Sequence, residues 1–590
     1  MDTAIKFFKN KYVYLSVLIF IIFLKNVLFI RYAYGYFFPC RITDDIPRIV
    51  LLYWSKFSSA LFISCFVLII RKRYLFYILL FFIDIWIMSN LLYFRNNNLL
   101  IDTHVILMIG NLRGFTDSIL SLIDYKVFMF PLLTLAFVLY DCFFKISFKP
   151  DYKLFFINIA LFFLIIRPIS NISELRDKSG TDCSVGCKIA DLFIPFHCLF
   201  SMKDYLPWQP MHPYYIEKHS VIDYFPATFV SDLLYPKFRV SHINVSLQDK
   251  QSPEYIYSFR KVTSDTSSTH PDIIIFLVES FESWLLNDST YLPNIKKFIH
   301  DNNCLCYPRM FSQIKYGNSG DGQLTTNTGL LPISCGAACN DYGSNVFPNF
   351  AHFYPNSFII NQNIYVWNQQ ITTLSYGYQS QVMDSVVIND GSDKDIFECL
   401  NRVCDTIGDP FCLQVITGST HIPFISGENN RLKLSDKNCG KQINKFINAF
   451  NYTDSCFSIF FKKFKQDRRL QNSIIIITGD HTVFNGGNMK DEFLDYSEKR
   501  NYELQNYVPF IVYSPDFSNC VIKNDIAYQM DIFPTILHLI NAQNYYFKGF
   551  GVDLLDSCAT KKRSVMPDKA YLLSNKFIRT DYFKQFKDSL

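Results

Sequence analysis

The chain has 590 residues, a length that allows more than one domain. Hydrophobic residues make up 49% of the sequence and aromatic residues 17%, and this composition indicates a membrane protein. The formal net charge is only +5 and is spread along the chain, which argues against a nucleic-acid-binding protein.

Five apolar segments precede residue 170, and each has close to the ~20 residues that a helix needs to cross a bilayer. No small-residue cleavage pattern follows the first segment, so it is predicted to be an uncleaved anchor instead of a signal peptide. The sequence therefore predicts an all-α transmembrane domain of five helices over residues 1–168. The five segments are residues 12–30, 50–70, 74–93, 127–144 and 154–167.

Basic side chains mark alternate loops of this domain. Lysines precede the first segment, a basic run at 71–73 separates the second from the third, and lysines within 145–153 separate the fourth from the fifth. Positively charged loops face the cytoplasm. With an odd number of spans, everything after residue 167 is then extracytoplasmic, which for a bacterial inner (cytoplasmic) membrane is the periplasmic side.

Two charged residues, Lys25 and Asp84, stand within the apolar segments. A rise of about 1.5 Å per residue places them at depths that differ by about one helical turn. One hypothesis is that they pair across two helices, as a structural contact or as part of a substrate path. The other, which we prefer at this stage, is that Lys25 reaches toward the membrane surface while Asp84 bonds to a neighbouring helix.

Residues 169–265 mix short apolar patches with Pro, Asp and Ser, and predict a partly helical extracytoplasmic linker. Fourteen of the 17 cysteines follow residue 170, and several come in close pairs. In an oxidising compartment these pairs predict disulfides of undetermined connectivity. A zinc site is disfavoured because the pairs lack C-x-x-C spacing. The pairs are Cys183/Cys187, Cys304/Cys306, Cys335/Cys339 and Cys399/Cys404.

Residues 266–590 alternate short apolar strands with helical segments, which predicts an extracytoplasmic α/β domain. Strands are predicted at 272–280, 411–417, 473–478 and 507–513. The first three deliver Glu279, His421 and the pair Asp480-His481. Because the carboxyl ends of parallel strands meet at one edge of a sheet, these side chains are expected to form a metal-supported site.

A nucleophile is predicted at Ser319, within the stretch 316–332. Glycines flank this serine and a helix-like segment follows, so backbone N–H groups could approach an anion. A serine there could lose its proton to a bound cation and attack phosphorus or sulfur. The simpler interpretation is that Ser319 only caps the helix. Rival hydroxyls at Thr325, Thr326 and Thr328 lie inside the helix, where they tend to bond back to it.

These motifs together resemble the lipoteichoic acid synthase group. The likeness rests on the five spans with an outward domain and on five short sequences. That group belongs, with the phosphoethanolamine transferases, to the alkaline phosphatase/sulfatase superfamily, which implies a sulfatase-like α/β domain with a mostly parallel central sheet. The sequences are VES at 278–280, GNSGDGQ at 317–323, THIPF at 420–424, TGDH at 478–481 and QMDIFPTIL at 529–537.

The resemblance implies that Glu279, Asp480 and His481 are metal ligands. It places Ser319 where the family has a threonine nucleophile that touches the metal and forms a covalent phospho-enzyme intermediate. Two carboxylates, an imidazole and an alkoxide are mostly hard ligands, so Mn²⁺ is the favoured cofactor, with Zn²⁺ or Mg²⁺ also compatible.

Substrate-binding residues follow from the same resemblance. His421 resembles the histidine that binds the transferred phosphate, and Trp367 resembles an aromatic contact to the head group. Gln369 stands where the synthases have a phosphate-binding arginine, and the missing charge weakens phosphate recognition. The run from Cys306 to Arg309 has its arginine one residue early for the C-x-P-x-R sequence of formylglycine sulfatases, which argues against that mechanism.

The predicted function is a membrane-anchored, metal-dependent transferase with a covalent serine intermediate. It would move a phospho-alcohol group, glycerol phosphate or phosphoethanolamine, from a phospholipid donor to an extracytoplasmic glycan or lipid acceptor. Two alternatives stay open. One is a sulfatase-type or phosphodiesterase-type ester hydrolase of the same superfamily, which membrane anchorage disfavours. The other is a non-catalytic glycan-binding relative, which the complete ligand set disfavours.

Overall fold

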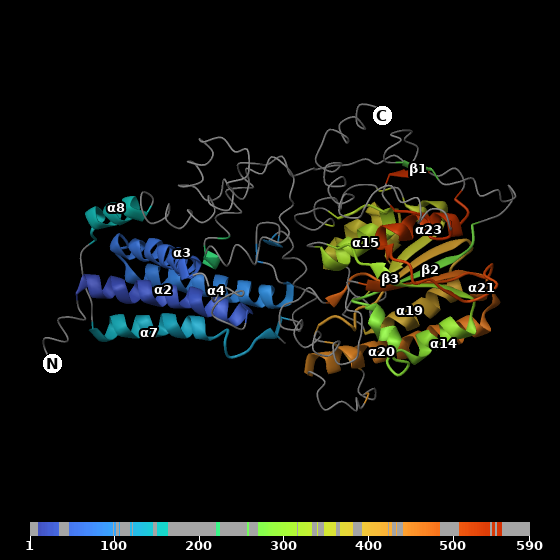
Figure 1. Ribbon diagram of the computed structural model, residues 1–590, viewed down its shortest axis with the longest axis horizontal. Helices are drawn as coiled ribbons and strands as arrows, with labels where there is room; N and C mark the ends of the chain where they lie inside the picture. Colours follow the sequence, from blue (N-terminus) through green and yellow to red (C-terminus); the bar gives the residue numbers. More distant parts are fainter. Residues whose placement is uncertain are drawn as a thin grey trace. The chain divides into compact units, whose positions relative to one another are not determined.

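The chain divides into two compact units in the computed structural model, one comprising Met1–Ile106 with Leu122–Pro236 and the other the remainder. Figure 1 shows helices alone in the first and a sheet with helices in the second. The structure describes residues 10–34, 46–97, 100–101, 105–106, 119–120, 122–144, 150–162, 220–222, 224, 256–258, 270–314, 317–332, 339, 347, 349–361, 366–381, 392–422, 424–426, 432, 441–483, 507–542, 546–548 and 551–556.

A helix of the first unit overlaps each of the five predicted apolar segments, although residues 163–167 of the last segment lie outside the described residues. Among the described helices, however, two and not five are long and apolar enough to cross a membrane by length and composition, at Lys11–Ala33 and Arg73–Arg95. The other apolar helices are shorter as described. The helices are α2 (Lys11–Tyr34), α3 (Ile46–Cys65), η1 (Phe66–Leu68), α4 (Arg73–Asn97), α7 (Met129–Phe144) and α8 (Tyr152–Leu161).

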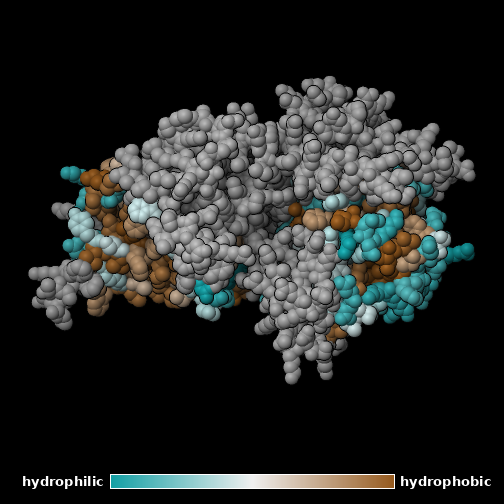
Figure 2. Space-filling model, in the orientation of Figure 1, coloured by the Kyte–Doolittle hydropathy of each residue, from teal (hydrophilic) through white to brown (hydrophobic). Residues whose placement is uncertain are grey.

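The helical unit exposes large apolar side chains on its outside. Figure 2 shows hydrophobic colours over much of the coloured part of its surface. Water-facing helices of a soluble protein present polar residues outward, so this surface is suited to contact with lipid. Examples at least half exposed are Phe20, Phe81, Phe82, Leu132, Leu135, Leu139, Phe143 and Phe156.

Lys25 and Asp84 pair across two helices, so the preferred expectation of separate contacts is wrong. The Lys25 ammonium donates to the Asp84 carboxylate and to the hydroxyl of Thr134, and that hydroxyl donates to Asp84. Both charged side chains are fully buried. The pairing satisfies each group inside an apolar core formed by α2, α4 and α7.

A mixed, mostly parallel sheet forms the centre of the α/β unit, as predicted. The strands run in the order β10-β3-β8-β7-β2-β6-β4-β5, with β9 beside β3, and only β8 is antiparallel to its neighbours among these described strands. They are β2 (Ile273–Val278), β3 (Cys304–Phe311), β4 (Asn356–Ile360), β5 (Ser380–Gln381), β6 (Phe411–Ile416), β7 (Ile474–Gly479), β8 (Tyr507–Tyr513), β9 (Val521–Ile522) and β10 (Ala527–Tyr528). A separate antiparallel pair joins β1 (Ile256–Ser258) to β11 (Tyr546–Lys548).

Strand β2 is buried on both faces, which explains its unbroken apolar sequence. Ile274 and Phe276 pack into one core and Ile275 and Leu277 into the other. Helices α15 and α23 lie on one side of the sheet, and α14, α19 and α20 on the other (Figure 1). The helices are η5 (Ser283–Asn287), α14 (Pro293–Asp301), α15 (Asn318–Thr328), η6 (Phe350–Phe353), η7 (Val366–Asn368), α17 (Gln369–Ser375), α19 (Asp393–Thr406), α20 (Lys441–Gln466), α21 (Arg468–Gln471), η9 (Gln529–Asp531) and α23 (Ile532–Leu539).

The expected disulfides are absent from the pairs that the structure describes in full. Cys304, Cys306 and Cys404 are free, buried thiols. Cys304 and Cys306 point to the same side of β3, and Cys404 lies five residues after Cys399 on α19. Side chains that project in parallel from a single regular element do not meet the geometry of a disulfide. Of the other predicted pairs, Cys183, Cys187 and Cys335 lie outside the described residues.

Candidate active site and metal centre

Three adjacent parallel strands, β7, β2 and β6, end at the same edge of the sheet. Val278 of β2 is paired with Gly479 of β7, so Glu279 and Asp480 leave the sheet side by side. The isoleucine runs that precede them are buried strands because β-branched side chains suit a sheet covered on both faces. Strand order thereby brings together two carboxylates that are about 200 residues apart in sequence.

Glu279, Asp480 and His481 form a compact group of donor atoms. One donor atom from each lies within 4.8 Å of those of the other two. His481 Nε2 is 3.2 Å from Glu279 Oε1 and 3.7 Å from Asp480 Oδ2. All three residues are buried. Carboxylate oxygens and an imidazole nitrogen at these separations could hold a divalent cation.

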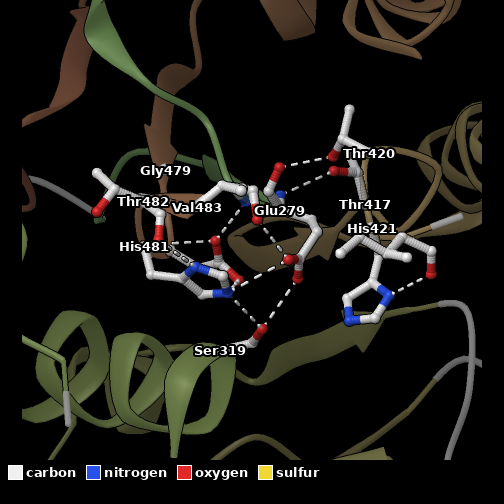
Figure 3. Close-up of polar contacts among 12 residues, drawn as sticks. Glu279, Ser319, Thr417, Thr420, His421, Gly479, His481, Thr482 and Val483 are labelled. Atoms are coloured by element: carbon white, nitrogen blue, oxygen red, sulfur yellow. Dashed lines mark hydrogen bonds and ion pairs between the residues drawn. The ribbon is translucent and has the colours of Figure 1, made fainter. Parts of the chain in front are cut away.

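Ser319 projects from the first turn of α15 into this group (Figure 3). Its hydroxyl donates to Glu279 Oε2 at 2.9 Å and lies 3.2 Å from His481 Nε2. The N-cap position of α15 belongs to Gly317, so Ser319 is not the helix cap. Of the three rival threonines, Thr328 donates its hydroxyl back to the helix carbonyl of Leu324, as expected for an interior position. For Thr325 and Thr326 the expectation is wrong, because their buried hydroxyls have no hydrogen-bond partner among the described residues.

The charges of the group shift one another's pKa values. Burial raises the pKa of Asp480, and the neighbouring charge of Glu279 raises it further. Burial would also raise the pKa of Glu279, but the adjacent His481 holds it below its ordinary value. Burial would lower the pKa of His481, whereas the two carboxylates raise it. The two carboxylates thus favour a positive charge beside them, which either a proton on His481 or a bound cation would supply.

The two oxygens of the Asp480 carboxylate have different surroundings. Oδ1 accepts hydrogen bonds from the backbone N–H of Ser280 at 2.8 Å and of His481 at 2.7 Å. Oδ2 is buried and has no hydrogen-bond partner. A buried carboxylate oxygen left without a donor is costly unless a cation binds it. The residues present therefore fit a divalent metal ion.

Ser280 also supports Glu279, and sequence reasoning missed it. Its backbone has φ of 56°, a left-handed conformation that is strained for a residue with a side chain. In this conformation its N–H reaches Asp480 while its hydroxyl donates to Glu279 Oε1 at 2.7 Å. The sequence shows Ser280 only as the last residue of the VES motif, and no sequence pattern predicts its left-handed backbone conformation.

The loop after β6 is tied both to Glu279 and to α19. Thr420 donates its hydroxyl to the Glu279 carbonyl at 2.6 Å, and Thr417 accepts the Glu279 N–H at 3.1 Å. The buried carboxylate of Asp393 accepts from the N–H groups of Gly418 and Ser419 and from a hydroxyl of α20. Sequence reasoning missed these contacts as well. The two threonines adjoin the His421 sequence, whereas nothing near Asp393 in the sequence points to the site.

His421 and Trp367 lie near the group, whereas Gln369 faces its own helix. His421 lies beside Glu279, away from His481 in the view of Figure 3. Trp367 lies against the start of α15, where its ring atoms are 3.3 Å from the place that a Cβ on Gly320 would take. The buried Gln369 donates to the Thr373 hydroxyl one turn along α17.

A family model described as Sulfatase matches residues 339–542, a range that contains Trp367, His421, Asp480 and His481. Two proteins from Bacillus subtilis are also similar to this chain in sequence. A lipoteichoic acid synthase-like protein is 24% identical over 337 residues, which are 53% of this chain and 53% of that protein. Lipoteichoic acid synthase 1 is 25% identical over 314 residues, 49% of this chain and 48% of the relative.

The chain is similar to proteins of the alkaline phosphatase/sulfatase superfamily. The chain spans about half the length of its lipoteichoic acid synthase relatives. The integral membrane protein lipooligosaccharide phosphoethanolamine transferase A from Neisseria meningitidis is similar in fold. It has a TM-score of 0.54 and 12% identity, and the match covers 90% of this chain and 96% of that structure. The likeness in fold to this transferase thus extends over most of the chain.

Proposed function

We propose that this protein is a membrane-anchored, metal-dependent transferase of the alkaline phosphatase/sulfatase superfamily. It moves a phospho-alcohol group from a phospholipid to an extracytoplasmic glycan or lipid by way of a covalent intermediate on Ser319. The observation that carries the proposal is the position of the Ser319 hydroxyl, in contact with both Glu279 and His481 at the ends of adjacent strands. Lipoteichoic acid synthase-like and phosphoethanolamine transferase relatives support a phospho-alcohol as the transferred group.

Glu279, Asp480, His481 and Ser319 would hold the metal ion, with Mn²⁺ favoured because most of these ligands are hard oxygen donors. A bound divalent cation lowers the pKa of the serine hydroxyl and neutralises charge on the transferred phosphate. Asp480 Oδ2 is the oxygen most in need of such a partner, since it is buried without a hydrogen bond.

The protein's own groups perform the first displacement. Ser319 Oγ forms a bond to phosphorus while the bond from phosphorus to the diacylglycerol oxygen breaks. Glu279 Oε2 accepts the hydroxyl hydrogen bond and so orients Ser319 Oγ, while the serine proton passes to water. Diacylglycerol leaves as an alcohol after taking a proton from water. In the second displacement an acceptor hydroxyl attacks phosphorus and gives its proton to water, while the bond from phosphorus to Ser319 Oγ breaks and the serine takes a proton from water.

His421 and Trp367 are proposed to bind the substrate on either side of the transferred phosphate. His421 can donate to a phosphate oxygen, since it lies beside Glu279 at the same edge of the sheet. Trp367 offers an aromatic face to the head group beside the first turn of α15. Gln369 remains a proposed substrate contact, although reaching a phosphate would require its amide to leave Thr373.

A lipid donor is supported by an inverted pattern of burial on α17. Thr372, Thr373 and Ser375 are buried, whereas Ile371 is 50% exposed and Leu374 is 58% exposed. A helix on a water-soluble surface normally buries its apolar side chains and exposes its polar ones. The exposed aliphatic side chains follow Trp367 by one and two turns, so we propose that they contact the apolar part of the donor lipid at the mouth of the site.

Five membrane spans over residues 1–168 and an extracytoplasmic location of residues 266–590 complete the proposal, with 169–265 as the linker. The alternating basic loops and the helices at all five predicted segments support this arrangement. Labelling of single introduced cysteines with a membrane-impermeant thiol reagent in intact cells tests it. Labelling of the α/β unit only after cell lysis would contradict it.

The deciding experiment follows the purified full chain in detergent with head-group-labelled phospholipids and Mn²⁺. Ser319→Ala should abolish diacylglycerol release and the labelled phospho-enzyme, whereas Ser319→Thr should retain both because it keeps a hydroxyl. Thr326→Ala is the matched control, since its hydroxyl lies inside α15. Head group released only to water would identify a phosphodiesterase-type hydrolase. Hydrolysis of sulfate esters alone, or glycan binding without any turnover, would contradict the transferase.

A further inference from the structure

Gln529 is a fully buried glutamine in η9 whose amide reaches the metal-binding strand β7. Its Nε2 donates to the carbonyl of Gly479 at 3.1 Å and to the carbonyl of Asp480 at 2.6 Å. These are main-chain contacts to the residue that carries the proposed metal ligand and to the residue before it. None of the roles proposed above uses Gln529.

The hydrogen bonds of the side-chain oxygen of Gln529 determine which way its amide points. Gln529 Oε1 accepts from the N–H of Gln313 at 2.8 Å and from the Ser312 hydroxyl at 3.3 Å. A flipped amide would place its NH₂ against an N–H donor and its oxygen against two carbonyls, so only one orientation is compatible with the surroundings. Gln313 returns the contact, because its side-chain oxygen accepts the Met530 N–H at 3.0 Å.

The same Asp480 carbonyl also touches the helix that carries Ser319. A Cβ built on Gly322 would stand 2.4 Å from this oxygen, so α15 can pack here only because residue 322 is glycine. Gly322 lies one turn after Ser319. One peptide group is therefore held between the Gln529 amide and α15.

We infer that Gln529 is a positioning residue that sets the Asp480 peptide against α15 and so fixes the metal ligands relative to the Ser319 hydroxyl. The inference rests on the proposed function for the identity of the nucleophile, but its effect on metal binding can be measured without any substrate. Residues that hold a ligand in place typically change metal affinity by about 10-fold to 100-fold when they are replaced. An error of about 1 Å in the placement of a reacting group can cost about 100-fold in rate.

Gln529→Glu tests the inference with little change in shape, since it replaces the donating NH₂ with an oxygen that faces two carbonyls. We expect Mn²⁺ affinity to fall about 10-fold or more. Binding is measured on the full chain in detergent by the electron paramagnetic resonance signal of free Mn²⁺. Gln414→Glu is the matched control, because Gln414 is also fully buried in this sheet. Its Oε1 accepts a hydrogen bond from the Tyr378 hydroxyl, so its side chain does not hold the end of β7. It should lose stability but keep its metal affinity.

Two milder variants keep the test decisive if Gln529→Glu fails to fold. Ser312→Ala removes one contact to Oε1 and should weaken Mn²⁺ binding about 2-fold to 3-fold, as a fraction of the full effect. Gly322→Ala displaces α15 from the Asp480 carbonyl and should lower kcat more than it changes Mn²⁺ affinity or KM. Folding of each variant is verified by its thermal unfolding transition.

The possible results separate this inference from the proposed function. Wild-type protein that binds Mn²⁺ but transfers nothing would overturn the transferase while leaving the affinity test intact. Wild-type protein that binds no divalent cation would overturn both. A folded Gln529→Glu or Ser312→Ala variant with wild-type affinity, or a Gln414→Glu variant that loses as much affinity as Gln529→Glu, would overturn the positioning role.

Discussion

The two units both bury charged side chains, but they treat them in opposite ways. In the helical unit, Lys25, Asp84 and Thr134 satisfy one another across three helices. In the α/β unit, Asp480 lies beside Glu279 and keeps one carboxylate oxygen without a hydrogen bond. We call a buried charged group closed when all its members are hydrogen-bonded to one another, and open when one polar atom lacks a partner. A closed group stabilises or specifies an arrangement of helices, whereas an open group has an atom that can still bind a ligand. The comparison therefore separates structural charge from functional charge without reference to any relative.

The largest effect is expected from Asp480→Asn. This change removes a buried charge that repels Glu279, so the metal-free protein should become more stable while Mn²⁺ binding and transfer are lost, with turnover reduced at least about 1000-fold. Thermal unfolding with and without Mn²⁺, together with diacylglycerol release, provides the measurement. Metal should raise the melting temperature of the wild type but not of the variant.

Asp393→Asn is the control for this prediction. Asp393 is equally buried, but its carboxylate accepts three hydrogen bonds from the loop after β6 and from α20. Its replacement should lower the stability of the metal-free protein. If Asp480→Asn destabilises the metal-free protein as much as Asp393→Asn does, the distinction between open and closed charge in this unit is wrong.

Lys25→Met should destabilise the helical unit by about 3–5 kcal/mol, because it leaves the Asp84 carboxylate buried without its cation. Adding Asp84→Leu should restore most of that loss, since an apolar pair of similar volume avoids the cost of burying charge. Thermal unfolding in detergent measures both variants. A double variant as unstable as the single one would show that the ion pair has a role beyond mutual neutralisation.

Replacing Ile371 and Leu374 together by serine should raise KM for long-chain phospholipid about 3-fold to 10-fold, through the loss of apolar contact area. Turnover of a water-soluble short-chain donor should be unchanged, because neither side chain contacts Ser319 in the described structure. Gln370→Ser, an exposed polar change on the same helix, is the control. Equal losses on both donors would mean that α17 supports the site itself instead of binding lipid.

A small, pH-dependent effect is expected at His538, which pairs with Asp553 near the end of the described chain. The hydrogen bond to Asp553 raises the pKa of His538 above 6.5 in the folded protein. The pair therefore contributes fully below pH ~6.5, and its contribution is lost as the pH rises through the raised folded value. His538→Gln should cost about 0.5–1 kcal/mol at pH 5.5 and less as the pH rises, as measured by thermal unfolding.

Much of this architecture could be predicted from short stretches of sequence. Apolar runs of helical length indicated the five helices, and isoleucine-rich runs indicated β2 and β7, because burial on both faces leaves a local pattern. The ends of those runs pointed to Glu279 and to Asp480-His481, since the residues that follow parallel strands gather at one edge. The predicted disulfides were wrong where the described pairs can be judged, because spacing alone does not reveal that both members lie on one regular element.

The sequence by itself determined which segments are apolar, which are strands, and which polar residues stand at their ends. Only the tertiary structure decided that Lys25 pairs with Asp84, that Ser280 turns back toward Asp480, and that Gln529 holds the Asp480 carbonyl. Hydrophobic periodicity is a local property and is written along the chain. A hydrogen bond between residues 49 or 200 positions apart depends on how strands are ordered and helices packed, and no local pattern records it.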